Sequence, residues 1–205
     1  MSLKFYSTCI FLCFALIAQA QSDYLLEIDG QNMAIEANEE YQVEINGKMV
    51  RIKLSQKDTL DFQKELFHFK HSKDYKVSSI DIEYGVTQYM IMTAEGSGFL
   101  IQSYDAFNPS LMTAMFLSEI TKESLDYGYQ MEKEKYSRRL ASGQEIEIEK
   151  ATLTYKDEVN IYEVSAIGGK DNGIIILTMV MSEELNSQGR SIIDMMWDSL
   201  AFKGS

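Results

Sequence analysis

The sequence predicts an α+β domain in which two main helices pack on a mostly antiparallel sheet, preceded by N-terminal β-hairpins. Strand-like segments follow one another in runs and do not alternate with helices, which excludes a parallel sheet built from βαβ units. Glycine-containing turns such as Asn46-Gly47 separate neighbouring strand-like segments, and this arrangement is typical of antiparallel pairing. Only two stretches, after residue 108 and near the C-terminus, repeat their apolar residues with a helical period.

Two hairpins are expected before residue 55. Residues 24–28 and 33–36 flank Asp29-Gly30, while residues 42–45 and 49–54 flank Asn46-Gly47. Both residues of such a turn adopt positive φ, which Asn, Asp and Gly tolerate best. Isolated hairpins are marginally stable. We therefore expect residues 21–58 to form a hairpin segment docked on a main α+β domain of residues 59–205.

The first half of the main domain is predicted to contain strands followed by one helix. Strand-like segments cover residues 66–69, 77–84, 88–92 and 98–104. Asn108-Pro109 then predicts a helix start, with Asn108 as N-cap and Pro109 at the first helical position. Met112, Phe116 and Ile120 recur every four residues, and Gly128 is expected to end the helix.

The second half repeats this order. Residues 145–149, 151–155 and 160–164 are strand-like, and the unbroken apolar run 174–181 predicts a central strand buried on both faces. Glu145, Glu147 and Glu149 alternate with isoleucines, so their carboxylates are expected to face water together. A final helix is predicted to bury one face formed by Ile193, Met196, Trp197 and Leu200.

From about residue 66 to the C-terminus, this order of elements resembles the Mog1/PsbP-like group, in particular its bacterial exported members. The matching features are the strands before Asn108-Pro109, the helix ending at residues 127–129, the strand pairs around Gly143 and Gly168-Gly169, and the strand 174–181 that leads into a terminal helix. The resemblance implies an α/β/α sandwich around an antiparallel sheet. It also implies a binding or assembly role instead of catalysis, and it supplies no functional residues. The hairpins of residues 24–54 lie outside it.

The first twenty residues have the pattern of a secretory signal peptide. Lys4 precedes an apolar run from residue 9 to residue 18, and Ala18-Gln19-Ala20 forms a small-residue cleavage site, so cleavage is expected between Ala20 and Gln21. The apolar run is shorter than the roughly 20 residues that a membrane-spanning helix needs. Both cysteines lie within this segment, which leaves a cysteine-free exported chain. We therefore expect a periplasmic or secreted protein of a bacterium.

Charge and composition disfavour several functions. The formal net charge of −12 opposes binding to nucleic acid, which depends on Lys and Arg at phosphates. No cofactor is expected, because the sequence has no phosphate-binding loop and no dinucleotide fingerprint. His68 and His71 are three residues apart on a predicted strand and would face opposite sides, so no metal site is expected. The methionines fall on apolar positions, where core packing explains them more simply than Cu(I) binding.

Three residues are candidates for ligand contacts, namely His68, Arg138 and Arg139. The two arginines form a compact basic pair against an acidic background and are able to receive a carboxylate or phosphate. Pairing with Glu132 or Glu134 is the simpler interpretation of the same pattern. No residue is assigned a catalytic, cofactor-binding or metal-binding role.

The sequence therefore favours an exported, non-enzymatic binding or assembly module whose partner is a protein or a small ligand. The alternatives are a hydrolase-type enzyme with a carboxylate-based site and a copper or calcium carrier. A deep pocket with a carboxylate beside His68 or Arg138 would favour the enzyme, whereas a shallow apolar patch would favour the binding module.

Overall fold

The computed structural model describes residues 24–182 and 187–203, and these residues form two compact units that divide between Gln56 and Lys57. The predicted signal peptide, including Ala18, Ala20 and Gln21, lies outside the described residues. Neither described helix is both long and apolar enough to cross a membrane.

The first unit consists of two antiparallel hairpins. Strands β1 (Tyr24–Ile28) and β2 (Gln31–Ile35) form one, and β3 (Glu40–Ile45) and β4 (Lys48–Lys53) form the other. Asn46 and Gly47 have φ angles of 53° and 74°, as the sequence predicts for this turn. The backbone N–H of Glu36 donates to the Tyr41 hydroxyl at 2.7 Å and joins the segment after β2 to β3. Both predicted hairpins are confirmed.

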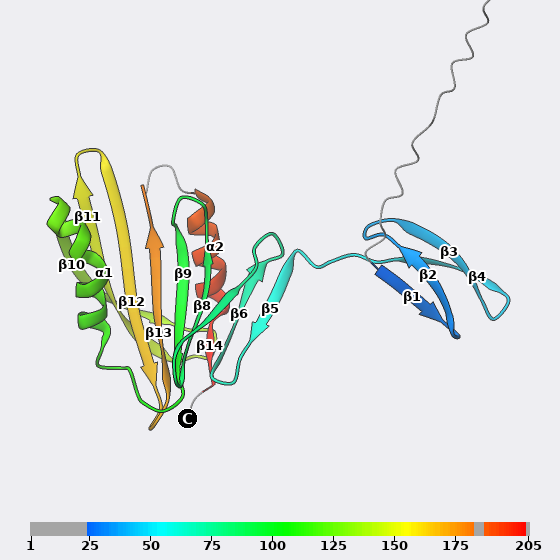
Figure 1. The fold of residues 1–205 in the computed structure, drawn as a ribbon, viewed down its shortest axis with the longest axis horizontal. Coiled ribbons are helices and arrows are strands. Elements are labelled where there is room, and N and C mark those ends of the chain that lie inside the picture. Colours follow the sequence, from blue (N-terminus) through cyan, green and yellow to red (C-terminus); the bar gives the residue numbers. More distant parts are fainter. Residues whose placement is uncertain (1–23, 183–186, 204–205) are drawn as a thin grey trace, which may run out of the picture. The chain divides into compact units, whose positions relative to one another are not determined.

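A seven-stranded antiparallel sheet forms the centre of the second unit (Figure 1). Its strand order is β10-β11-β12-β13-β9-β8-β7. The strands are β7 (Ser78–Glu83), β8 (Val86–Met92), β9 (Gly98–Tyr104), β10 (Gln130–Arg139), β11 (Glu145–Tyr155), β12 (Glu158–Gly168) and β13 (Gly173–Val180). A smaller sheet of order β14-β6-β5 contains β5 (Thr59–Gln63), β6 (Phe67–Ser72) and β14 (Ala201–Phe202).

Strand β13 separates two apolar clusters. Ile174 and Ile176 belong to the cluster on one face of the sheet, and Ile175 and Leu177 belong to the cluster on the other. All four side chains are buried. The prediction of a central strand buried on both faces is therefore confirmed.

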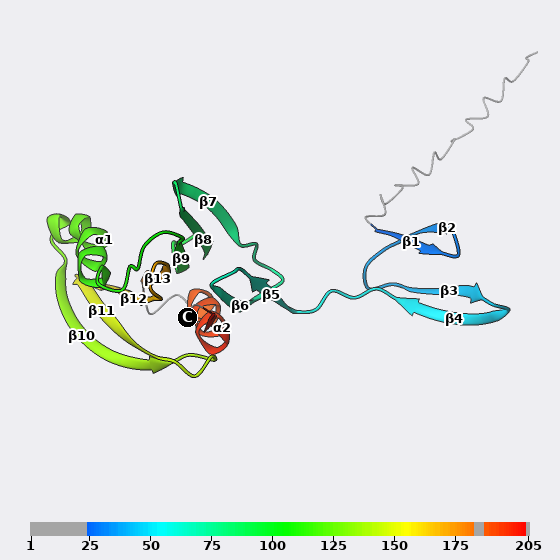
Figure 2. The ribbon, with the colours of Figure 1, turned by 90° about the horizontal axis from the view of Figure 1, so that it is seen from below.

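The two helices lie on opposite sides of the large sheet (Figure 2). Helix α1 (Thr113–Tyr127) packs over β11 and β12 with Leu117 fully buried. Helix α2 (Ser187–Ser199) packs against β6, β9 and β13, and β10 curves towards it. The predicted α+β class with a mostly antiparallel sheet and two helices is confirmed, and strands dominate the unit.

The start of α1 differs from the prediction. The helix begins at Thr113 with Met112 as N-cap, four residues after Pro109. The Asn108 side chain bonds the chain before the helix, where its Oδ1 accepts from the Ser110 N–H at 2.9 Å, and its Nδ2 donates to the Gly169 carbonyl at 2.7 Å. The predicted stop is confirmed, since Gly128 caps the C-terminus with a φ of 113°.

Candidate functional site

A row of polar side chains crosses the face of the large sheet that α2 covers. Glu134, Lys150, Glu163 and Thr178 occupy aligned positions on β10, β11, β12 and β13. The same face carries core residues such as Ile176. Polar groups cost free energy on such a face unless they find partners. The row therefore places four polar side chains next to the apolar core.

Within the row, Lys150 and Glu134 form an ion pair, whereas the Glu163 carboxylate accepts hydrogen bonds from neutral hydroxyl groups. Lys150 Nζ lies 2.7 Å from Glu134 Oε1. The Tyr136 hydroxyl donates to Glu163 Oε1 at 2.7 Å, and the Thr178 hydroxyl donates to Glu163 Oε2 at 3.2 Å. Among the described residues, Glu163 has no ion pair. Its negative charge is held by two hydroxyl groups and not by a cation.

Tyr136 stays a hydrogen-bond donor in this environment. Burial raises the pKa of the Tyr136 hydroxyl to about 12, and its hydrogen bond to Glu163 acts in the same direction. The hydrogen bond to Arg138 and the positive charge of its guanidinium group oppose this rise in pKa. At neutral pH Tyr136 is therefore protonated, and its O–H points its dipole at the Glu163 carboxylate.

A pocket of about 190 Å³ opens between this row and α2. Strands β10 to β13 contribute one wall, and α2 contributes the other. The lining residues are Arg138, Lys150, Ile161, Glu163, Thr178, Val180, Arg190, Ile193, Asp194 and Trp197. We call this the Trp197 pocket, because Trp197 is large, apolar and only 2% exposed.

Two N–H donors of the Trp197 pocket have no acceptor among residues 24–182 and 187–203. The guanidinium carbon of Arg138 lies 5.0 Å from the centroid of the Trp197 ring. Arg138 Nε and Trp197 Nε1 are both buried and lack a hydrogen-bond partner. Each unsatisfied buried donor costs about 1–3 kcal/mol. Both residues line the same pocket.

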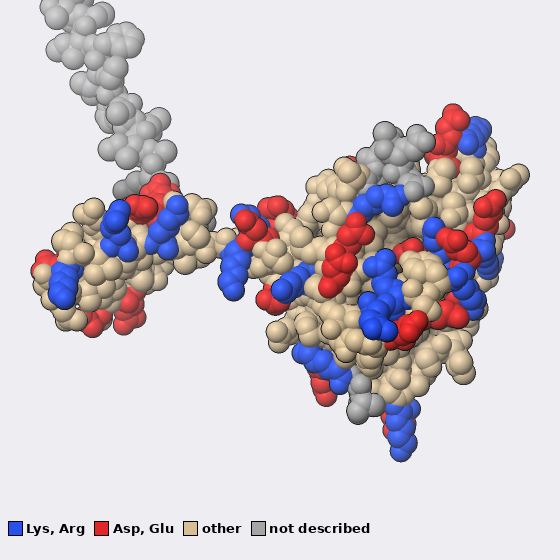
Figure 3. Space-filling view, turned by 180° about the vertical axis from the view of Figure 1, so that it is seen from behind, with Lys and Arg blue, Asp and Glu red and all other residues tan. Residues whose placement is uncertain are grey.

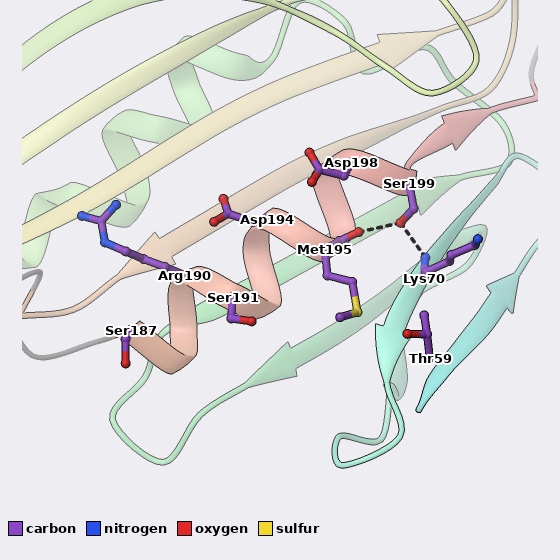
Figure 4. Close-up of a pocket in the computed structure, with 9 residues that line it drawn as sticks. All are labelled: Thr59, Lys70, Ser187, Arg190, Ser191, Asp194, Met195, Asp198 and Ser199. Atoms are coloured by element: carbon purple, nitrogen blue, oxygen red, sulfur yellow. Dashed lines mark hydrogen bonds between the residues drawn. The ribbon is translucent and has the colours of Figure 1, made fainter. Parts of the chain in front are cut away.

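A larger groove of about 680 Å³ runs along α2 where the helix faces β5 and β6 (Figure 4). The Ser199 hydroxyl ties the two elements together, donating to the Met195 carbonyl at 2.6 Å and accepting from the Lys70 N–H at 2.8 Å. Arg190 and Asp194 line both this groove and the Trp197 pocket. Within the described part of the chain, no buried unpaired side-chain donor or acceptor lines the groove. We therefore place the candidate site in the smaller Trp197 pocket.

The three candidate residues from the sequence do not come together. Arg138 lines the Trp197 pocket, whereas Arg139, the next residue on β10, is exposed opposite Glu145. The simpler expectation for Arg138 is not met, because the structure pairs Glu134 with Lys150. His68 lies on β6 between β5 and β14, where its Nδ1 is buried without a partner.

The other residues of the Trp197 pocket were not predicted as site residues. Their signal in the sequence is subtle, because Glu163 and Thr178 are polar residues at inward positions of strongly apolar strands. The glutamates of β11 that were expected to face water together are not all free of partners. Lys135 Nζ lies 2.9 Å from Glu147 and 3.2 Å from Glu149. Glu149 additionally accepts from the Thr113 hydroxyl at 2.9 Å.

No group of three or more His, Cys, Asp or Glu side chains is placed to hold a metal ion in residues 24–182 and 187–203. His71 Nδ1 lies 2.8 Å from the Ser72 carbonyl oxygen. Acidic and basic side chains are interspersed over the face of the second unit seen in Figure 3.

No protein-family model matches this sequence, and no curated protein matches it significantly. Among solved structures, the chain is similar to the solution structure of cyanobacterial PsbP (CyanoP) from Synechocystis sp. PCC 6803. The sequences are 10% identical, the match covers 71% of this chain and 93% of that chain, and the TM-score is 0.46. The likeness is one of fold, and it is weak. It agrees with the PsbP-like resemblance expected from the sequence and supports no conclusion about function.

Proposed function

We propose that this chain is an exported, non-enzymatic binding module of the bacterial envelope or medium, and that it holds a small carboxylate ligand in the Trp197 pocket. In this proposal the second unit is an α/β/α sandwich in which the sheet and α2 form a rigid frame around the ligand. The observation that carries the proposal is the pair of buried, unpaired donors, Arg138 Nε and Trp197 Nε1, in one pocket.

A carboxylate fits the chemistry of these donors. Its two oxygens accept several hydrogen bonds, and a charged donor makes these bonds shorter and stronger. Lys150 and Arg190 add positive charge to the lining. The pocket volume of about 190 Å³ is below the 300–1,000 Å³ that is usual for drug-sized ligands. The proposed ligand is therefore a carboxylate with few heavy atoms.

Calorimetric titration of the purified exported protein with acetate, propionate and succinate, at constant ionic strength, tests this function. We expect saturable binding of at least one of these ions and none of chloride. Arg138→Met should abolish the binding, because it removes the guanidinium donors while keeping a long side chain. The matched variant Arg139→Met changes an exposed arginine and should bind as the wild type does.

The proposal fails if none of the three carboxylates binds. It also fails if Arg138→Met binds them as the wild type does. The Arg139→Met control distinguishes a loss of binding at the pocket from a general effect of removing one positive charge.

A carboxylate-based hydrolase is the second candidate, and one observation favours it. Glu163 and Asp194 line the Trp197 pocket together with Arg138. Two carboxylates at one site are the groups that acid–base hydrolysis needs. This candidate predicts turnover of small chromogenic esters or glycosides that Glu163→Gln abolishes. The binding module predicts ligand binding without turnover in both proteins.

A further inference from the structure

The Trp197 pocket has a negative pole as well as a positive one. Glu163 lines it from β12, and exposed Asp194 lines it from α2. A site that receives only an anion has no need of a carboxylate inside it, because like charges repel. The presence of Glu163 in the same pocket as Arg138 therefore bears on the charge of the ligand.

The Glu163 carboxylate is prepared to accept a further donor. An ionised carboxylate offers about four acceptor positions, and two of them are occupied by the Tyr136 and Thr178 hydroxyls. Thr178 is only 2% exposed, so the Oε2 side of the carboxylate is shielded from solvent. Lys150, its neighbour in the row, directs its Nζ to Glu134. An incoming ammonium group would therefore find a partly desolvated negative charge, where Coulomb attraction is stronger than in water.

We propose that the ligand is a zwitterion with an ammonium group beside its carboxylate, as in a free α-amino acid. The carboxylate meets Arg138 and Trp197 Nε1, and the ammonium group meets Glu163. This inference rests on the proposed carboxylate-binding function and narrows its ligand class.

The remaining lining limits the side chain of such a ligand. Ile161, Val180 and Ile193 are apolar and lie among the residues around the pocket. Two of them, Val180 and Ile193, are buried. Together with the volume of about 190 Å³, these apolar residues fit a ligand with a small apolar side chain. Alanine is therefore a suitable probe.

The test compares three probes of similar size by calorimetry on the exported protein. Propionate carries only the carboxylate, ethylamine carries only the ammonium group, and alanine carries both. We expect alanine to bind about tenfold or more tightly than propionate, since a hydrogen bond to a charged group adds affinity of this order. Ethylamine alone should bind more weakly than alanine.

Glu163→Gln identifies the group that receives the ammonium. The amide keeps the shape of the side chain and remains able to pair with the Tyr136 and Thr178 hydroxyls, so the fold should be retained. We expect alanine to lose its advantage in this variant, while propionate binds at least as tightly as before. Glu145→Gln, which changes an exposed carboxylate on β11, is the matched control and should behave as the wild type.

The outcomes separate the two proposals. If propionate binds as tightly as alanine, the zwitterion inference is wrong and the carboxylate-binding function stands. If alanine keeps its full advantage in Glu163→Gln, the assignment of the ammonium to Glu163 is wrong. If neither propionate nor alanine binds, both proposals fail.

Discussion

Replacing Arg138 with methionine tests whether this arginine is kept for a ligand or for the fold. The change removes the contact between the guanidinium group and the Trp197 ring at 5.0 Å, a cation–π interaction of about 0.5–2 kcal/mol. It also removes the buried Nε that has no acceptor, and an unsatisfied donor of this kind costs about 1–3 kcal/mol. The two contributions oppose each other. We therefore expect the free energy of unfolding to fall by no more than about 1 kcal/mol or to rise by up to about 2.5 kcal/mol.

Urea unfolding in a buffer without carboxylates measures this change. Trp197 is the only tryptophan of the chain, so its fluorescence reports on the pocket itself. Arg139→Met serves as the control and should shift the free energy of unfolding by no more than about 0.5 kcal/mol, as an exposed substitution usually does. A loss of 3 kcal/mol or more in Arg138→Met, which is typical of breaking a buried ion pair, would refute the reasoning and make Arg138 a structural residue.

Three further predictions concern the rest of the molecule. The folded-state pKa of Tyr136 is about 12 and its ordinary value is 10.0, so its contribution to stability is complete below about pH 10 and is lost as the pH rises towards about 12. Between about pH 9 and about pH 11.5, the urea midpoint of the wild type should therefore fall more than that of Tyr136→Phe, and equal falls would contradict this. Gly98→Ala should lower the free energy of unfolding by about 2–4 kcal/mol, because the new Cβ would lie 2.1 Å from the Ile91 carbonyl oxygen. Gly143→Ala has open space around the new Cβ and should lower it by only about 1 kcal/mol in the same urea assay. N-terminal sequencing of the exported protein should begin at Gln21, and an intact N-terminus would remove the predicted cleavage site.

Much of the fold follows from short stretches of sequence. Asn46-Gly47 predicts its hairpin because both residues tolerate positive φ, and Gly128 predicts the end of α1 for the same reason. The apolar run around Ile176 predicts β13 because a strand covered on both faces buries its successive residues. Each of these features depends on residues within a few positions of one another.

The exact start of α1 and the strand β10 did not follow from the local sequence pattern. Asn108 Oδ1 accepts from the nearby Ser110 N–H, while its Nδ2 donates to the carbonyl of Gly169, 61 residues away, and the helix begins only at Thr113. Strand β10 is mostly polar and lies at an edge of the sheet, so its sequence lacks the apolar alternation by which strands are recognised.

The sequence by itself determined the hairpin turns, the alternating strands, the apolar faces of the helices and the pattern of an export signal. Only the tertiary structure decided that Glu134, Lys150, Glu163 and Thr178 form one row, because this depends on the register of four strands. It also decided that Trp197 closes over Arg138, because α2 reaches the sheet through packing between segments far apart in the chain. Period and turn chemistry are local properties, whereas the Trp197 pocket exists only where distant surfaces meet.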